Sequence, residues 1–254
     1  MNALVLAAGY ATRLRPLTEN RAKPLLPVGG RPMIDYLVDA ISAVPGVRGI
    51  HVVTNSRFAP HFETWADGRG VAVHDDGTTS DEDRLGAIGD LRYVVDRAGL
   101  EDDLIVVAGD NLFEFSLADE VAFWRAKGER SVVALHDVGD RELASRYGVV
   151  ALDGDDRVVE FVEKPEDPPS TLAATASYVF SRDHVGLVDT YLAEGNLPDQ
   201  PGRYVAWLAQ REPVYGFRFE GEWLDIGDHR QLLEADNRMR RRRGLPERDA
   251  YSAD

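Results

Sequence analysis

The chain has 254 residues, of which 44% are apolar, so it can bury a sizeable hydrophobic core. It contains no cysteine, which excludes disulfides, zinc–thiolate sites and iron–sulfur clusters. The N-terminus lacks the basic segment of a signal peptide, and no apolar run approaches the roughly 18 residues of a membrane span. We therefore expect a cytoplasmic protein without a membrane partner.

Acidic residues outnumber basic ones by 44 to 29, which gives a formal net charge of −15. Such a chain should repel nucleic acid, and we expect no nucleic-acid partner. Residues 10–31 are the exception, because they carry five basic residues and only one acidic residue. This segment indicates either a pocket for a small polyanion or a solvated loop. The arginine-rich stretch 238–243 ends a predicted helix, where cations are favoured.

The first half of the chain alternates strands with helices. Strands are predicted over residues 2–7, 48–54, 70–74 and 103–108, and helices over 32–44, 58–67 and 83–97. This alternation is typical of a parallel sheet. Beyond residue 130, strands are predicted over 131–136, 147–152, 157–162, 174–180 and 213–219, with helices over 182–194 and 228–243. We predict an α/β fold with one mixed sheet, parallel in the first half and extended by antiparallel strands in the second.

A glycine, Gly9, follows the first strand and opens the basic segment. Because glycine has no side chain, backbone N–H groups there can approach phosphate oxygens. Arg13 can donate a forked pair of hydrogen bonds to a pyrophosphate, and Lys23 can place a point charge beside a phosphorus atom undergoing substitution. The segment is neither a G-x-G-x-x-G motif nor a P-loop, which argues against a dehydrogenase.

Two aspartates are candidate metal ligands. Asp110 follows a buried strand, and the carboxyl ends of such strands are where α/β sheets bind ligands. Asp225 is the second candidate, since two carboxylates can hold one Mg²⁺ that shares its shell with substrate phosphates. Taken singly, Asp110 could be a turn residue, Asp225 a helix N-cap and Lys164 a solvated strand end.

Four segments together resemble the motifs of the sugar-1-phosphate nucleotidyltransferases, the NDP-sugar pyrophosphorylases that include glucose-1-phosphate thymidylyltransferases. The first covers residues 4–28 and contains L-A-A-G-Y-A-T-R-L-R-P-L-T and then A-K-P-L-L-P-V, with Ala11 where the family usually has a second glycine. The others are Gly109-Asp110-Asn111, Glu163-Lys164-Pro165 and Trp223-Leu224-Asp225-Ile226-Gly227. The resemblance extends from Leu4 to about Asn237.

The resemblance implies a single Rossmann-like, GT-A-type domain over residues 1–243, with a flexible tail over 244–254. Its nucleotide-binding half would be 1–112 and its sugar-phosphate-binding half 113–243. The implied nucleotide site is Leu6, Ala7, Ala8, Gly9, Arg13, Lys23, Gly86 and Asp110, with Arg13 and Lys23 catalytic. The implied sugar-phosphate site is Tyr147, Gly148, Glu163, Lys164 and Tyr178. Asp110 and Asp225 would bind Mg²⁺, and a homo-oligomer is possible.

The implied reaction transfers a nucleotidyl group from an NTP to a sugar 1-phosphate, with dTTP or UTP and glucose 1-phosphate expected. In the base-reading segment 83–89, Gly86 fits a backbone contact, but the family's glutamine is missing. Glu82 and Asp83 could accept a hydrogen bond from several bases, or could simply be acidic residues at a helix N-terminus. A cytidylyl- or guanylyltransferase acting on another phosphorylated molecule therefore stays open. A non-catalytic sensing subunit would be expected to lack Lys23 or a metal aspartate.

Overall fold

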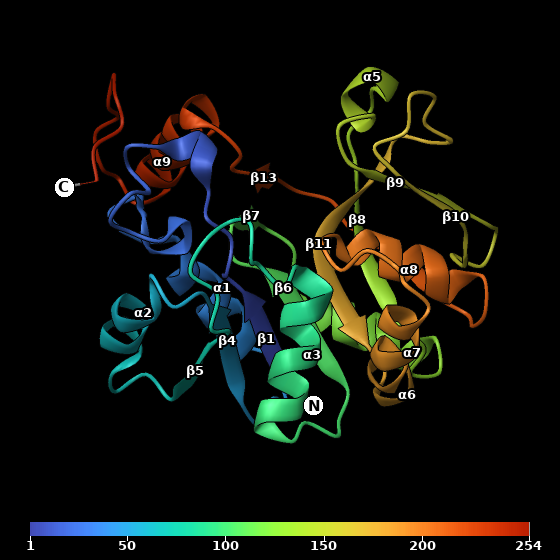
Figure 1. Ribbon diagram of the computed structural model, residues 1–254. Coiled ribbons are helices and arrows are strands. Elements are labelled where there is room, and N and C mark those ends of the chain that lie inside the picture. The colour runs from blue at the N-terminus through green and yellow to red at the C-terminus, as the bar shows by residue number, and fades with distance from the viewer. Residues whose placement is uncertain (254) are drawn as a thin grey trace.

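A mixed sheet of nine strands runs through the computed structural model, which describes residues 1–253 (Figure 1). The strands are β1 (Asn2–Leu6), β4 (Ile50–Thr54), β5 (Val71–Asp75), β6 (Leu104–Ala108), β8 (Val132–Asp137), β9 (Gly148–Leu152), β10 (Val158–Glu163), β11 (Leu172–Phe180) and β12 (Tyr215–Arg218). Their order is β10-β9-β11-β6-β1-β4-β5, and β8 lies between β11 and β12.

The pairing directions confirm the predicted mixed sheet. In the first half, β1 pairs in parallel with β4 and β6, and β4 pairs in parallel with β5. In the second half, β11 runs antiparallel to β6 and β8, and β9 and β10 form an antiparallel hairpin. One pairing differs from the expectation of added antiparallel strands, because β12 runs parallel to β8.

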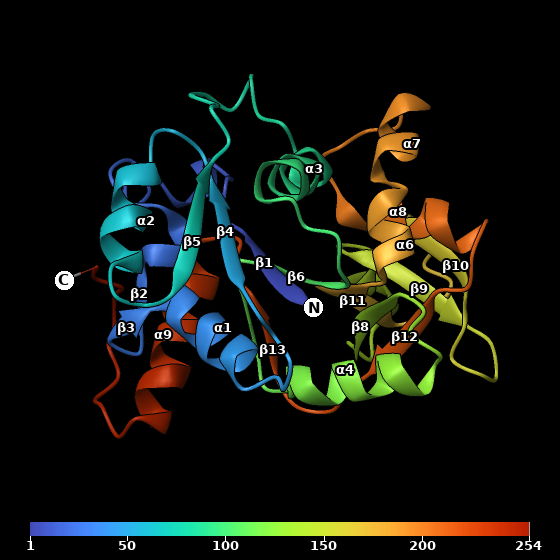
Figure 2. The ribbon, with the colours of Figure 1, turned by 90° about the horizontal axis from the view of Figure 1, so that it is seen from below.

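Helices cover both faces of the sheet (Figure 2). They are α1 (Met33–Ser42), α2 (Ala59–Ala66), α3 (Ala87–Ala98), α4 (Leu117–Ala126), α5 (Arg141–Ala144), α6 (Arg182–Gly186), α7 (Val188–Ala193), α8 (Pro201–Ala209) and α9 (His229–Arg242). Because side chains alternate along a strand, Ala3 and Val5 of β1 pack in one core with α1, α2 and α4. Leu4 faces the opposite core, which contains residues of α3, α7 and α8.

Several helices differ from the sequence prediction. The helix expected over residues 182–194 is two short helices, α6 and α7, and the first ends at Gly186. The helix expected from residue 83 begins only at Ala87, after Gly86 with φ of 78°. We did not predict α4, α5 or α8, although Pro201 stands at a first helical position, where proline is favoured.

Four short strands lie outside the main sheet. They are β2 (Pro27–Val28), β3 (Arg31–Pro32), β7 (Asn111–Phe113) and β13 (Trp223–Asp225). The strands β7 and β13 pair antiparallel, although more than a hundred residues separate them in the sequence. None of the four was predicted from the sequence.

The last helix returns to the first half of the chain (Figure 1). The Gly29 N–H donates to Asp236 of α9 at 2.7 Å, and Met239 lies too close to Gly29 to leave room for a side chain there. After Gly244, residues 245–253 form no helix or strand, and the Tyr251 hydroxyl donates to the Pro27 carbonyl. The boundary at residue 112 and the flexibility of the tail stay predictions. Within residues 1–253, no helix combines the length and apolar character needed to cross a membrane.

A buried carboxyl lies between α4 and the sheet. Glu120 is fully buried, and its Oε2 accepts a hydrogen bond from Ser177 Oγ at 2.8 Å, while no donor among residues 1–253 reaches Oε1. Burial raises the pKa of Glu120 from 4.5 to about 8, against the opposing effect of the Ser177 hydrogen bond. Glu120 is therefore protonated in the folded protein at neutral pH.

This carboxyl should make stability depend on pH. Because its pKa is higher when folded, the unfolded chain binds fewer protons between about pH 4.5 and 8, and the free energy of unfolding falls as pH rises through this window. We expect Glu120→Gln to raise the free energy of unfolding by about 1–3 kcal/mol more at pH 8 than at pH 5. Urea unfolding at both pH values measures this. The exposed control Glu101→Gln should show no such difference, and an equal effect of Glu120→Gln at both pH values would contradict the assignment.

Candidate functional site

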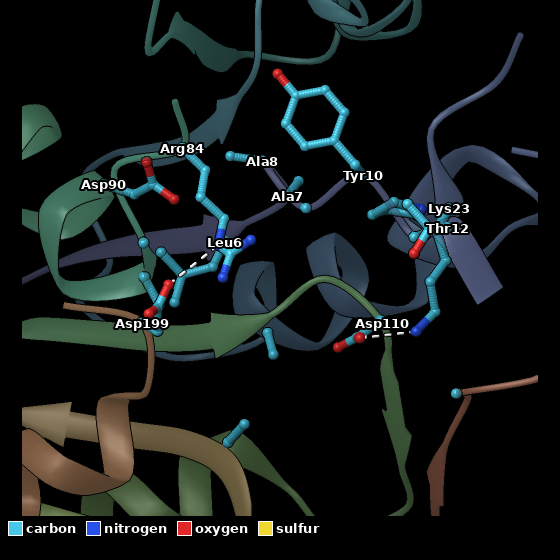
Figure 3. Close-up of a pocket in the computed structure, with 18 of the residues that line it drawn as sticks. Leu6, Ala7, Ala8, Tyr10, Thr12, Lys23, Arg84, Asp90, Asp110 and Asp199 are labelled. Carbon is cyan, nitrogen blue, oxygen red and sulfur yellow. Dashed lines mark hydrogen bonds and ion pairs between the residues drawn. The ribbon is translucent and has the colours of Figure 1, made fainter. Parts of the chain in front are cut away.

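A cavity of about 510 Å³ opens beside the carboxyl ends of β1 and β6 (Figure 3). It brings together every residue that the resemblance assigned to the nucleotide site. These residues are Leu6, Ala7, Ala8, Gly9, Arg13, Lys23, Gly86 and Asp110. Asp225, the second predicted metal ligand, also lines this cavity.

The loop after β1 presents unpaired backbone donors to the cavity. Within residues 1–253, no acceptor takes the amide hydrogens of residues 8–11. A hydrogen bond fixes the loop to the end of β4, because the buried side chain of Asn55 donates to the Ala8 carbonyl at 2.8 Å. Ala11 has φ of 46° and ψ of 45°, so alanine adopts here the left-handed conformation that glycine favours. Consecutive free N–H groups of this kind form an anion-binding concavity.

Lys23 and Asp110 form an ion pair at the floor of the cavity. The Lys23 ammonium lies 2.7 Å from Asp110 Oδ2, as Figure 3 shows. The Lys23 side chain is 10% exposed and that of Asp110 is 38% exposed. Lys23 is thus held in place from one side by Asp110. The negative charge of Asp110 compensates the buried Lys23 ammonium while no ligand is bound. An anionic ligand could then interact with the same ammonium.

The pairing of β7 with β13 places Asp225 beside Asp110. In this small sheet Asp225 lies opposite Asn111, the residue that follows Asp110. Burial, followed by the negative charge of Asp110, raises the pKa of Asp225 to about 6. Lys23, Lys164 and Arg13 act on the same pKa in the opposite direction. The charges of three cations and a second carboxylate therefore act on Asp225, although Asp110 and Asp225 are 115 positions apart in the sequence.

A series of hydrogen bonds fixes the orientation of Asp110. Trp223 Nε1 donates to Asn111 Oδ1 at 2.6 Å, and Asn111 Nδ2 donates to Asp110 Oδ1 at 2.9 Å. The other oxygen of Asp110 accepts from Lys23. Both carboxylate oxygens of Asp110 are thus oriented by the protein.

A second cavity, of about 440 Å³, contains the residues assigned to the sugar phosphate. These are Tyr147, Gly148, Glu163, Lys164 and Tyr178. The two cavities share six lining residues, which are Arg13, Ala176, Asp199, Pro201, Asp225 and Gly227. The two cavities therefore meet at Arg13 and Asp225.

The second cavity has aromatic and acidic walls. Tyr147 packs edge-on against Trp223, with ring centroids 4.8 Å apart. A Cβ on Gly148 would come within 2.8 Å of the Phe161 ring and 3.0 Å of Glu163 Oε2, so only glycine fits there. Burial raises the pKa of Glu163, while Lys164 and Arg203 lower it. The Lys164 side chain is exposed to the cavity and makes no ion pair within residues 1–253.

Backbone conformations that L-residues rarely adopt are concentrated at this site. Of the five non-glycine residues with positive φ in residues 1–253, Ala11, Lys164 and Ala176 line the two cavities. Each costs about 1–2 kcal/mol relative to a right-handed conformation. Ala176 lies in β11 where the register with β8 shifts between Ala174 and Tyr178. This irregularity turns the strand at the junction of the cavities.

The structure corrects the sequence interpretation of the base-reading segment. Glu82 and Asp83 do not line the nucleotide cavity, and Asp83 instead accepts hydrogen bonds from the Thr79 and Ser80 amides. Arg84, Asp90 and Asp199 line it, and sequence reasoning did not select them. Asp90 is one helical turn beyond Gly86, and that spacing was the available signal.

The donor set at the junction fits a magnesium ion. Among residues 1–253 no cluster of three or more histidine, aspartate or glutamate side chains could hold a metal. Mg²⁺ does not require one, because it usually keeps several waters and binds one or two carboxylates together with substrate phosphates. Burial and then the negative charge of Asp110 raise the pKa of Asp225, and a divalent cation between the two carboxylates would compensate both.

Curated proteins with similar sequences act on nucleotides and sugar phosphates. A protein of Sulfolobus acidocaldarius assigned as a mannose-1-phosphate guanyltransferase is 31% identical over 92% of this chain and 61% of its own length. A UTP–glucose-1-phosphate uridylyltransferase of Synechocystis is 31% identical over 89% of this chain and 60% of its own length. The chain thus spans about three-fifths of the length of these relatives.

Solved structures and a family model agree with this similarity. A Bacillus anthracis protein assigned as a glucose-1-phosphate thymidylyltransferase, in complex with sucrose, superimposes with a TM-score of 0.78 at 26% identity, covering 94% of this chain and 95% of that one. A UDP-glucose pyrophosphorylase complexed with UDP-glucose shares the fold, with a TM-score of 0.78 at 22% identity over 95% of this chain and 98% of that one. The model of the nucleotidyl transferase family matches residues 2–242, and the chain belongs to that family.

Proposed function

We propose that this chain transfers a nucleotidyl group from an NTP to a sugar 1-phosphate, forming an NDP-sugar and pyrophosphate. The observation that carries the proposal is the junction of the two cavities at Arg13 and Asp225, with Lys23 and Asp110 beside it. One cavity offers backbone donors and cations to a triphosphate, and the other offers Lys164 and hydroxyl-binding groups to a sugar phosphate. Two such sites in contact are what a direct transfer needs.

The chemistry follows from this arrangement. An oxygen of the sugar phosphate attacks the α-phosphorus of the NTP in line, and the bond from this phosphorus to the bridging oxygen breaks, so that pyrophosphate leaves with the electron pair. Lys23 neutralises charge on the α-phosphate, Arg13 binds the phosphates being released, and Lys164 orients the attacking phosphate. Catalysis then consists of positioning and electrostatic stabilisation, and no covalent enzyme intermediate is required.

We propose Asp110 and Asp225 as the ligands of Mg²⁺. When bound, the ion would neutralise phosphate charge during the transfer. Glu163 and the aromatic pair Tyr147–Trp223 would contact the sugar ring. The preferred substrates on this proposal are dTTP or UTP with glucose 1-phosphate, as the name of the uridylyltransferase relative suggests. The relative named as a mannose-1-phosphate guanyltransferase is the reason to test GTP and mannose 1-phosphate as well. A cytoplasmic location, a homo-oligomeric state and the absence of nucleic-acid and membrane partners stay predictions.

Pyrophosphate release tests this proposal directly. The full chain is incubated with each of GTP, UTP, dTTP, CTP and ATP, with a panel of sugar 1-phosphates, with and without Mg²⁺. The proposal expects release only when an NTP, a sugar 1-phosphate and Mg²⁺ are all present. Binding of nucleotide and sugar phosphate without turnover in any combination would instead favour a non-catalytic sensing role.

Lys23 should act in the chemical step. We expect Lys23→Ala to lower kcat by about 10²–10³, the range for one preorganised electrostatic contact. Lys23→Arg should not restore activity, because a planar guanidinium cannot occupy the narrow space that the ammonium shares with Asp110. Steady-state kinetics measure both variants. Lys127→Ala, outside both cavities, is the control, and near-native kcat in either Lys23 variant would remove Lys23 from the mechanism.

The two aspartates should act together on the metal. We expect Asp110→Asn and Asp225→Asn each to lower activity and to raise the Mg²⁺ concentration needed for half-maximal rate. Asp225→Asn should keep or raise Tm, because it removes a repelled buried carboxylate. Activity against Mg²⁺ and thermal unfolding measure these effects, with the exposed Asp119→Asn as control. An unchanged Mg²⁺ dependence in both variants would contradict the shared site.

Lys164 should affect only the second substrate. Removing a charged hydrogen bond costs about 1.5–3 kcal/mol, so we expect Lys164→Ala to raise KM for sugar 1-phosphate by roughly 10–150-fold. NTP binding, measured by calorimetry, should change little. Glu166→Ala, two residues away and outside the cavity, is the matched control. If Lys164→Ala abolished NTP binding and spared the sugar phosphate, the assignment of the two cavities would be reversed.

A further inference from the structure

One carboxyl group in the nucleotide cavity has no role in the reaction described above. Asp90 lies on α3, one helical turn beyond Gly86, and its side chain lines the same cavity as the loop after β1. It is only 6% exposed, although an ionisable side chain is rarely buried without a partner. Figure 3 shows it in the region of the cavity that Arg84 and Ala8 also line.

Asp90 is paired with a second buried carboxyl, Asp76. Asp76 Oδ1 accepts two hydrogen bonds from Thr78, from its amide and its hydroxyl, each at 2.7 Å. No donor among residues 1–253 reaches the remaining buried atoms, Asp76 Oδ2 and Asp90 Oδ1. Each carboxyl affects the pKa of the other, and two carboxyl groups can hydrogen-bond only where they share one proton, so these two buried oxygens are the atoms that one proton would join.

The shared proton belongs mainly to Asp90. Burial, followed by the charge of Asp76, raises the pKa of Asp90 to about 8. Burial also raises the pKa of Asp76, but the two hydrogen bonds from Thr78 oppose that rise. Asp90 therefore donates its proton to Asp76. Its other oxygen, Oδ2, is not among the buried unpartnered atoms of residues 1–253, and because Asp90 lines the cavity, Oδ2 is the oxygen available to accept a hydrogen bond from a ligand there.

Arg84 supplies a donor at the same part of the cavity. Its Nε donates to Asp199 at 3.1 Å and its Nη1 donates to the Asp81 carbonyl at 3.0 Å. These two bonds hold the guanidinium, while no acceptor in the described part of the chain takes the hydrogens of Nη2. The cavity wall thus presents an acceptor on Asp90 and a donor on Arg84.

We infer that Asp90 and Arg84 read the edge of the nucleobase and select a keto base, one in which a ring N–H lies directly beside a carbonyl oxygen. Guanine, uracil and thymine have this edge, with the N–H facing Asp90 and the carbonyl facing Arg84. Cytosine and adenine carry an unprotonated ring nitrogen there, which is an acceptor and would face the acceptor of Asp90. This inference rests on the proposed function, and it restricts the NTP substrate to GTP, UTP or dTTP.

A purely structural role for the Asp76–Asp90 pair makes a different prediction. The pair would then only join α3 to the loop after β5, and its loss would change stability without changing which base is preferred. Nucleotide preference, measured as a ratio of affinities, therefore separates the two roles. Sites built to hydrogen-bond a particular group discriminate strongly against ligands that lack it.

Calorimetric titration of the full chain with GTP, UTP, dTTP, CTP and ATP in the presence of Mg²⁺ tests the inference. We expect the wild-type protein to bind at least one keto NTP ten-fold or more tightly than CTP and ATP. Asp90→Ala should reduce this ratio to less than about three-fold. Asp90→Asn should keep it, because the amide can donate to Asp76 and leave its oxygen toward the base. Asp96→Asn, exposed on the same helix, is the control.

A second variant guards against loss of folding in Asp90→Ala. Arg84 is exposed, and Arg84→Met should also lower the preference for the keto NTP by removing the donor to its carbonyl. A wild-type preference for CTP or ATP, or an unchanged ratio in both Asp90→Ala and Arg84→Met, would overturn the inference while leaving the proposed function standing. Failure of the wild-type protein to bind any NTP would contradict the proposed function and the inference together.

Discussion

The pairing of β7 with β13 is the contact on which the site depends. Each strand has only three residues, and neither belongs to the main sheet. Their pairing nevertheless sets Asp225 opposite Asn111 and so brings the second half of the chain to the end of β6. Of the six residues that the two cavities share, β13 contributes Asp225, which is the acidic residue nearest to Asp110 in this small sheet.

The junction between the two cavities gathers positive charge, whereas the molecule as a whole is negatively charged. The chain carries a net charge of −15, yet Arg13, Lys23 and Lys164 all act on the Asp225 carboxyl. Concentrating cations in a cavity of an acidic protein favours small anions over nucleic acid, whose long phosphate backbone would meet the remaining negative surface. The free amides of residues 8–11 add to the same field. On the proposed function, phosphate binding would combine backbone and side-chain donors.

Much of the fold could be predicted because its signals are local. Apolar runs such as residues 103–108 and the alternation of strands with helices depend on neighbouring residues, and they indicated the parallel half correctly. The helix α8 was not predicted, although Pro201 is a residue type favoured at the first position of a helix. The strands β7 and β13 leave no periodic pattern in three residues each, and their pairing depends on residues far apart in the chain.

The site residues also fall into those that local motifs predicted and those that depend on tertiary contacts. The residues carried by motifs, from Leu6 to Lys164, line the two cavities as expected. Asp90 was missed because an aspartate in the first turn of a helix is ordinarily a solvated residue that favours the helix dipole, and its spacing from Gly86 was the only signal in the sequence. Its burial and its effect on the pKa of Asp76 depend on the tertiary structure. Glu82 and Asp83, which are also acidic and lie within four positions of Gly86, do not line the cavity.

A crystal structure of the protein with an NDP-sugar and Mg²⁺ tests the central claim most directly. The account predicts the nucleotide in the cavity lined by residues 6–13, the sugar beside Tyr147 and Glu163, and Asp110 and Asp225 as ligands of one Mg²⁺ between them. A nucleotide bound in the second cavity, or the two carboxylates far apart and on different ions, would contradict it.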